Sequence, residues 1–154
     1  MTLFVPQIQL ASFFNFVINL VPMATLRRLN ASHNRLELLP KDLGFSSHLK
    51  VLDLSENLLK VISDKIYDLA SLEVINLAGN QIQTLPVQFG VKMINLVELY
   101  MERNWIGELP KKLSGWKRNL KVLCMNHISI IYAISSDSRC FLAGKIQSGI
   151  YPQR

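Results

Sequence analysis

The sequence predicts an α/β fold: a short curved solenoid with a parallel β-sheet on its concave side and short helices or 3₁₀ turns on its convex side. Three observations predict it. A pattern of leucines and one asparagine returns every 23 or 24 residues. Each return contains the apolar–polar alternation of a β-strand. No single copy has enough apolar surface to fold alone, so stacked copies would bury their apolar faces as one continuous core.

The repeat is written LxxLxLxxNxLxxLP, where x is any residue, and positions are counted from its first leucine. Four copies match it: LRRLNASHNRLELLP from Leu26, LKVLDLSENLLKVIS from Leu49, LEVINLAGNQIQTLP from Leu72 and LVELYMERNWIGELP from Leu96. A degraded fifth copy, LKVLCMNHISI, begins at Leu120. One copy alone would mean little, but four that agree in spacing and residue type make the assignment specific.

These copies resemble the leucine-rich repeat family over about residues 26–130. Repeats of this length that end in LxxLP resemble the intracellular class of the family, which includes Ras-pathway scaffolds. The resemblance implies a solenoid and a role in scaffolding or signal transduction.

Positions 4 and 6 should point into the core, because they alternate with polar residues. They are Leu29, Leu52, Ile75, Leu99 and Leu123, with Ala31, Leu54, Leu77, Met101 and Met125. On the convex side, an apolar residue recurs at an equivalent place in each copy, and should pack inward from a short helix or 3₁₀ turn: Leu43, Ile66, Phe89 and Leu113.

An asparagine follows each of the first four predicted strands, at position 9: Asn34, Asn57, Asn80 and Asn104. An amide side chain can donate to and accept from backbone groups that a turn leaves unpaired. We therefore expect a structural asparagine ladder at this column and no ligand site, and in the family such residues link adjacent coils. The fifth copy has Ile128 at this position, so the ladder should end before it.

Composition divides the chain into three parts: an apolar N-terminal cap or targeting segment (1–25), the repeats (26–130), and a basic, poorly patterned tail (131–154). The first 26 residues have no charged side chain. No basic residue precedes the apolar run, as it would in a signal peptide, so cap and targeting segment both stay open. Neither end has the polar cap that a solenoid needs. A truncated or spliced piece of a larger protein, and self-association through uncapped ends, are both expected alternatives.

The charge of +6 is concentrated in the C-terminal third. Residues 1–110 have 9 Lys and Arg against 10 Asp and Glu, whereas residues 111–154 have 8 against 1. This region lacks the dense clustering and interleaved aromatics of a nucleic-acid surface, so a solvated basic end is expected and no nucleic acid. Cys124 and Cys140 are too few for a disulfide framework, which favours reduced thiols in the cytoplasm. Contact with a membrane is expected only through the apolar N-terminus.

No set of residues predicts catalysis. His33 and His127 share position 8 but are four repeats apart, roughly 19 Å at the spacing of strands. Cys124 and His127 have a spacing that suits a metal, but no third ligand is evident. No glycine-rich phosphate motif occurs. The sequence therefore predicts no enzyme, no metal and no cofactor.

Positions 3, 5 and 7 should face out from the concave sheet, and positions 8 and 10 should lie at its rim. These side chains are not needed for the core, so they can encode a partner. The predicted partner-binding residues are Arg28, Asp53, Val74, Asn76, Glu98, Tyr100, Glu102, Arg103 and Trp105. Tyr, Trp and Arg are enriched at binding hot spots, which places the centre of the site on the third and fourth repeats. In the alternative, Trp105 covers the edge of the next coil, and Glu102 and Arg103 are solvated charges.

The sequence thus predicts a non-enzymatic protein–protein interaction module, a cytoplasmic scaffold or signalling adaptor that binds another protein through its concave face. The alternative is a membrane-anchored or secreted receptor-like fragment with residues 1–24 as targeting segment.

Overall fold

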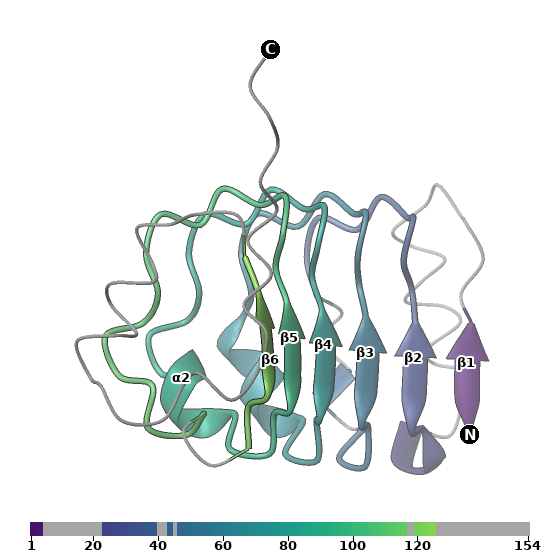
Figure 1. Cartoon of the computed structure of the whole chain (residues 1–154). Coiled ribbons are helices and arrows are strands. Elements are labelled where there is room, and N and C mark those ends of the chain that lie inside the picture. Colours follow the sequence, from purple (N-terminus) through teal and green to yellow (C-terminus); the bar gives the residue numbers. More distant parts are fainter. Residues whose placement is uncertain (5–22, 40–42, 45, 117–118, 126–154) are drawn as a thin grey trace.

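The computed structural model describes residues 1–4, 23–39, 43–44, 46–116 and 119–125. Over these residues it is an open parallel sheet whose strands stand side by side in chain order (Figure 1). The strands are β1 (Thr2–Phe4), β2 (Arg28–Asn30), β3 (Val51–Asp53), β4 (Val74–Asn76), β5 (Glu98–Tyr100) and β6 (Val122–Cys124). The predicted leucine-rich solenoid is confirmed.

Like positions of successive repeats lie next to one another. Leu29 pairs with Leu52, and Leu52 pairs with Ile75 in the next strand. The same register continues to β5 and β6. Each position of the repeat is therefore a column across the sheet, with neighbours roughly 4.8 Å apart.

Strand β1 was not expected, because the sequence pattern predicted only the five strands that begin with β2. Leu3 pairs with Leu29, and the backbone nitrogen of Arg27 donates to the Met1 carbonyl at 2.9 Å. Leu3 and Val5 have the spacing of positions 4 and 6. The pattern search missed them because its first position would precede Met1, and because β1 lies 26 residues before β2 where the repeats are 23 or 24 long.

The core lies between the sheet and the convex side. Side chains at position 4 are nearly inaccessible in β2 to β5, and position 6 is equally buried in those repeats. The convex side has the 3₁₀ helices η1 (Met23–Thr25) and η3 (Asp64–Asp68) and the short helix α2 (Phe89–Lys92). The convex apolar residues predicted from the sequence are all buried: Leu43, Ile66, Phe89 and Leu113.

Ser63 explains why the second repeat departs from the LxxLP ending. It is the N-cap of η3, and its hydroxyl oxygen accepts a hydrogen bond from the Lys65 backbone nitrogen at 3.3 Å. Serine is among the residues preferred at this position, because it satisfies a backbone donor that the helix leaves unpaired. The third repeat has Pro86 at the equivalent place, and α2 follows it.

Two glycines allow the convex segments of the third and fourth repeats to touch. The Gly115 backbone nitrogen donates to the Gly90 carbonyl at 2.8 Å. A Cβ atom on Gly90 would lie 2.4 Å from the Lys112 carbonyl oxygen, and one on Gly115 would lie 2.4 Å from the Val91 carbonyl oxygen. A larger residue at either place would separate the two coils.

Several sequence expectations fall outside the described residues. These are the conformation of most of the apolar N-terminal segment, the place of His127 and Ile128, and the basic tail. Within the described ranges, the structure contains no helix with the length and hydropathy needed to cross a bilayer.

Candidate protein-binding surface

A left-handed residue ends each strand's excursion along the concave face. His33, Glu56 and Arg103 have φ of 54° and Gly79 has φ of 67°. This conformation is uncommon for residues other than glycine. It occurs at position 8 in four successive repeats, directly before the asparagine of position 9. The reversal therefore places that asparagine against the backbone of the neighbouring coil.

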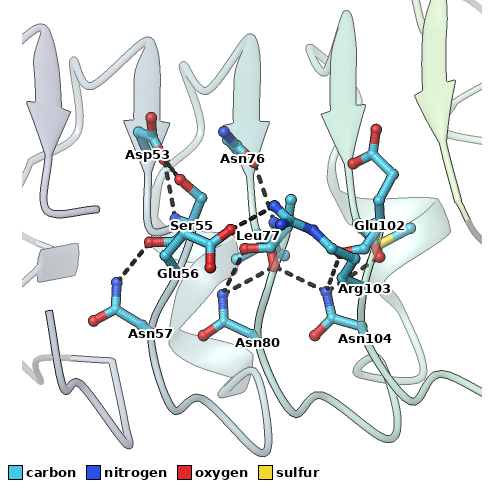
Figure 2. Close-up of polar contacts among 12 residues, drawn as sticks. Asp53, Ser55, Glu56, Asn57, Asn76, Leu77, Asn80, Glu102, Arg103 and Asn104 are labelled. Atoms are coloured by element: carbon cyan, nitrogen blue, oxygen red, sulfur yellow. Dashed lines mark hydrogen bonds and ion pairs between the residues drawn. The ribbon is translucent and has the colours of Figure 1, made fainter. Parts of the chain in front are cut away.

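The position 9 asparagines bridge adjacent coils (Figure 2). Asn80 accepts from the Leu59 backbone nitrogen at 3.0 Å and donates to the carbonyls of Leu54 at 3.0 Å and Leu77 at 2.9 Å. Asn57 and Asn104 make the same set of bonds one repeat earlier and one repeat later. All three side chains are buried. These asparagines hold the coils together and are not available to a ligand.

A second pair of asparagines lies at the opposite ends of the strands. Asn95 donates to the Ala70 carbonyl and Asn119 donates to the Ile94 carbonyl, each at 2.8 Å. Each is the last residue of a 24-residue repeat, directly before the leucine that opens the next copy. Sequence reasoning missed this pair, although the asparagine that ends both longer repeats was a usable sign of it.

Position 5 of the first three repeats has a structural use as well as exposure. The Oδ1 atoms of Asn30, Asp53 and Asn76 accept from the backbone nitrogen two residues further on, at 2.9, 3.0 and 3.1 Å. Such bonds stabilise the turn after a strand. Tyr100 occupies this column in the fourth repeat, and its hydroxyl instead donates to Glu98 Oε2 at 2.9 Å. The concave face therefore changes character at β5.

Arg103 forms an ion pair with Glu56, two repeats away (Figure 2). The pair passes over Gly79, where an added Cβ atom would lie 2.5 Å from Glu56 Oε1. The absence of a side chain at Gly79 thus allows a contact between coils that are not neighbours. The charge of Arg103 is countered within the chain, which the sequence pattern did not anticipate.

The other predicted partner-binding residues differ in how far they are exposed. Trp105 is 62% exposed, and Arg28 is also exposed. The rest are half-buried between their neighbours in the sheet: Asp53, Val74, Asn76, Glu98, Tyr100 and Glu102. In the described part of the chain, no group of three or more His, Cys, Asp and Glu side chains could hold a metal ion.

Cys124 was expected to face out from the concave sheet at position 5, but it is buried. Burial, followed by the neighbouring Glu102 and Glu98 carboxylates, raises the pKa of the Cys124 thiol from 9.0 to about 11. The same causes, burial first and then Glu98, raise the pKa of Tyr100. Both side chains are therefore neutral at physiological pH.

We expect iodoacetamide to alkylate Cys124 slowly at pH 8. Thiolate is the reactive form, and a pKa higher by two units lowers the thiolate fraction about 100-fold. A Cys140→Ser variant leaves Cys124 as the single thiol, whose labelling can be timed by mass spectrometry. The same variant unfolded in urea is the control and should react at an ordinary rate. Equal rates in the folded and unfolded states would contradict the prediction.

Comparison with known proteins agrees with this geometry. A family model of the leucine-rich repeat matches residues 24–82. The solved structure of the leucine-rich repeat protein LIC12759 of Leptospira interrogans superimposes with a TM-score of 0.53 and 26% identity, over 83% of this chain and 39% of that one. The chain belongs to the leucine-rich repeat family. Leucine-rich repeat domains generally mediate protein–protein interaction and are typically not catalytic themselves.

The curated relatives are much longer proteins. Leucine-rich repeat serine/threonine-protein kinase 1 of Caenorhabditis elegans is 31% identical over 91 residues, which are 58% of this chain and 4% of the kinase. The adenylate cyclase of Schizosaccharomyces pombe is 29% identical over 117 residues, 75% of this chain and 7% of the cyclase. The human volume-regulated anion channel subunit LRRC8A is 34% identical over 97 residues, 62% of this chain and 12% of the subunit. This leucine-rich repeat chain thus matches only a small part of each, and their names include enzymes and a channel subunit.

Proposed function

We propose that this leucine-rich repeat chain is a non-enzymatic interaction module, a scaffold or signalling adaptor of the intracellular kind, that binds a protein partner through its concave face. The observation that carries the proposal is the concentration of hot-spot residue types on one strand and its turn. Tyr100 ends β5, and Arg103 and Trp105 follow within five residues. Aromatic and arginine side chains dominate binding energy at protein interfaces.

The state of these side chains also supports the proposal. Trp105 leaves most of its surface to solvent, and a large exposed aromatic gains much by burial against a partner. Tyr100 is fixed by its bond to Glu98, and Arg103 is fixed by its pair with Glu56. Side chains that are already held lose little conformational freedom on binding.

Strand β1 favours the cytoplasmic module over the receptor-like alternative. Thr2–Phe4 pairs with β2 along its whole length, so removal of residues 1–24 as a targeting segment would expose the edge of β2. An edge strand with unpaired backbone groups invites association. We therefore propose that the first residues stay with the chain.

The proposal predicts that a double variant, Tyr100→Ala with Trp105→Ala, loses its partner in cells. The reason is that both aromatic rings leave the centre of the concave site while the core stays intact. The measurement is affinity purification with quantitative mass spectrometry, where partner recovery should fall at least about tenfold, equivalent to about 1.4 kcal/mol. The same data report whether peptides from residues 1–24 are present in the purified chain.

The matched control is Val87→Ala with Ile94→Ala, which removes two exposed apolar side chains near α2 and away from the concave face. Circular dichroism must show that all three proteins fold alike. Partners that survive the concave change but disappear in the control would place the site on the convex side and overturn the proposal.

A further inference from the structure

Two carboxylates on the concave side of the fourth repeat have no ionic partner among the described residues. Glu98 lies in β5, and Glu102 lies four residues further on, at position 7. The three ion pairs in the described chain are Lys50 with Glu73, Lys65 with Asp68, and Arg103 with Glu56. Glu98 and Glu102 belong to none of them.

The groups that do contact these carboxylates are neutral. The Tyr100 hydroxyl donates to Glu98 at 2.9 Å. The Cys124 thiol lies near Glu102, and its raised pKa keeps it protonated. A neutral donor orients a carboxylate but leaves its negative charge in place. Half-burial between strands strengthens the interaction of that charge with a cation compared with a charge in open water.

No described cation can reach this place. Arg103 is the neighbour of Glu102 in sequence, but its guanidinium is bound to Glu56. Arg28 is on the same face, yet β2 is three strands from β5, roughly 14 Å at the usual strand spacing.

An apolar strip lies beside the charges. Val74 and Val122 pair with Glu98 on either side at position 3, and both are only partly buried. Val51 extends the strip by one strand beyond Val74. The concave face of β3 to β6 thus presents apolar contacts with an uncompensated negative charge among them, although the chain as a whole has a net charge of +6.

We propose that the concave face of β4 to β6 takes an extended protein segment in which a lysine or arginine side chain sits next to an apolar one. The cation pairs with Glu98 and Glu102, and the apolar side chain lies against Val74 or Val122. This inference rests on the proposed function and adds the chemistry of the partner. Charge complementarity of this kind sets specificity and the rate of association more than total affinity.

The test uses fluorescence anisotropy with three labelled nine-residue peptides, GLRGLRGLG, GLQGLQGLG and GLEGLEGLG. The full chain is titrated into each peptide at low salt. The arginine peptide should bind at least about tenfold more tightly than the glutamine peptide, and added salt should reduce the difference by screening. Because the whole protein is positively charged, a non-specific interaction would give the opposite order.

Two charge-matched variants locate the effect. Glu98→Gln with Glu102→Gln should bring the arginine and glutamine peptides to nearly equal affinity. Glu37→Gln with Glu108→Gln removes the same two charges from exposed positions outside the concave columns, and should preserve the preference. Equal binding of the three peptides by the unchanged chain, or equal losses in both variants, would overturn the inference.

The chain's own basic C-terminal residues are the competing occupant. If the preference for arginine is seen only after Arg139, Lys145 and Arg154 are changed to glutamine, these residues and not a partner occupy the surface, and the inference is wrong. Failure of this inference differs from failure of the proposed function. Partner loss in the Tyr100 and Trp105 variant, together with no preference among the peptides, would keep the interaction module and exclude the cationic partner.

Discussion

Replacing Asn80 with alanine is expected to lower the free energy of unfolding by about 3 kcal/mol, the range for leaving a buried donor unsatisfied together with lost hydrogen bonds. Leu59 N–H would lose the acceptor that Asn80 provides. The carbonyls of Leu54 and Leu77 would each keep a second donor, because Asn57 and Asn104 also bond to them. The orphaned N–H therefore dominates the loss. Urea denaturation followed by circular dichroism measures it.

Asn95→Ala is the matched control, since it deletes the same side chain from an exposed position. Asn95 makes one bond, to the Ala70 carbonyl, and water can replace it, so the expected loss is at most about 1 kcal/mol. Similar losses for the two variants would show that burial of the position 9 column does not set its contribution to stability.

The sequence was sufficient for the architecture of β2 to β6. The repeat spacing aligns like positions, and alternation within each strand separates core from surface. These two regularities are enough to predict that Leu52 meets Leu29 and Ile75. The number of strands was not predictable in the same way. Strand β1 contributes only a fragment of the pattern, and its pairing depends on a connection that is longer than a repeat.

The candidate surface could be predicted by column but not by pairing. Position within the repeat correctly separates Trp105, which is exposed, from Ile106, which is buried. It does not say that Arg103 reaches Glu56 across Gly79, because this contact skips a repeat and depends on side-chain length and on the missing Cβ atom. Nor does it predict that Cys124 is buried. Interactions within a column follow from the repeat, whereas interactions across columns require coordinates.

Trp116 lies outside the repeat pattern, and yet its side chain is among the largest of the fully buried ones. It meets Phe89 edge to face, with ring centroids 6.0 Å apart and an interplanar angle of 88°. Its Nε1 atom has no hydrogen-bond partner in the described structure. The aromatic surface of Trp116 therefore stabilises the convex core, while its indole N–H opposes burial.

Two substitutions at Trp116 separate these effects. Trp116→Ala should lower the free energy of unfolding by about 4 kcal/mol, since it leaves a large cavity beside Phe89. Trp116→Phe keeps much of the aromatic surface and removes the unpaired donor, so the smaller cavity and the relief of that donor should nearly cancel, with a net loss of at most about 1 kcal/mol. Urea denaturation of the two variants beside the unchanged chain measures both.

Trp105→Ala is the control for loss of a tryptophan as such, because its side chain is mostly exposed and its removal should change stability by no more than about 0.5 kcal/mol. If Trp116→Phe costs as much as Trp116→Ala, the indole N–H must have an acceptor in the folded protein, and its donor then contributes to stability. If Trp116→Phe is close to neutral, the shape of the ring and its contact with Phe89 are what hold the third and fourth repeats together on the convex side.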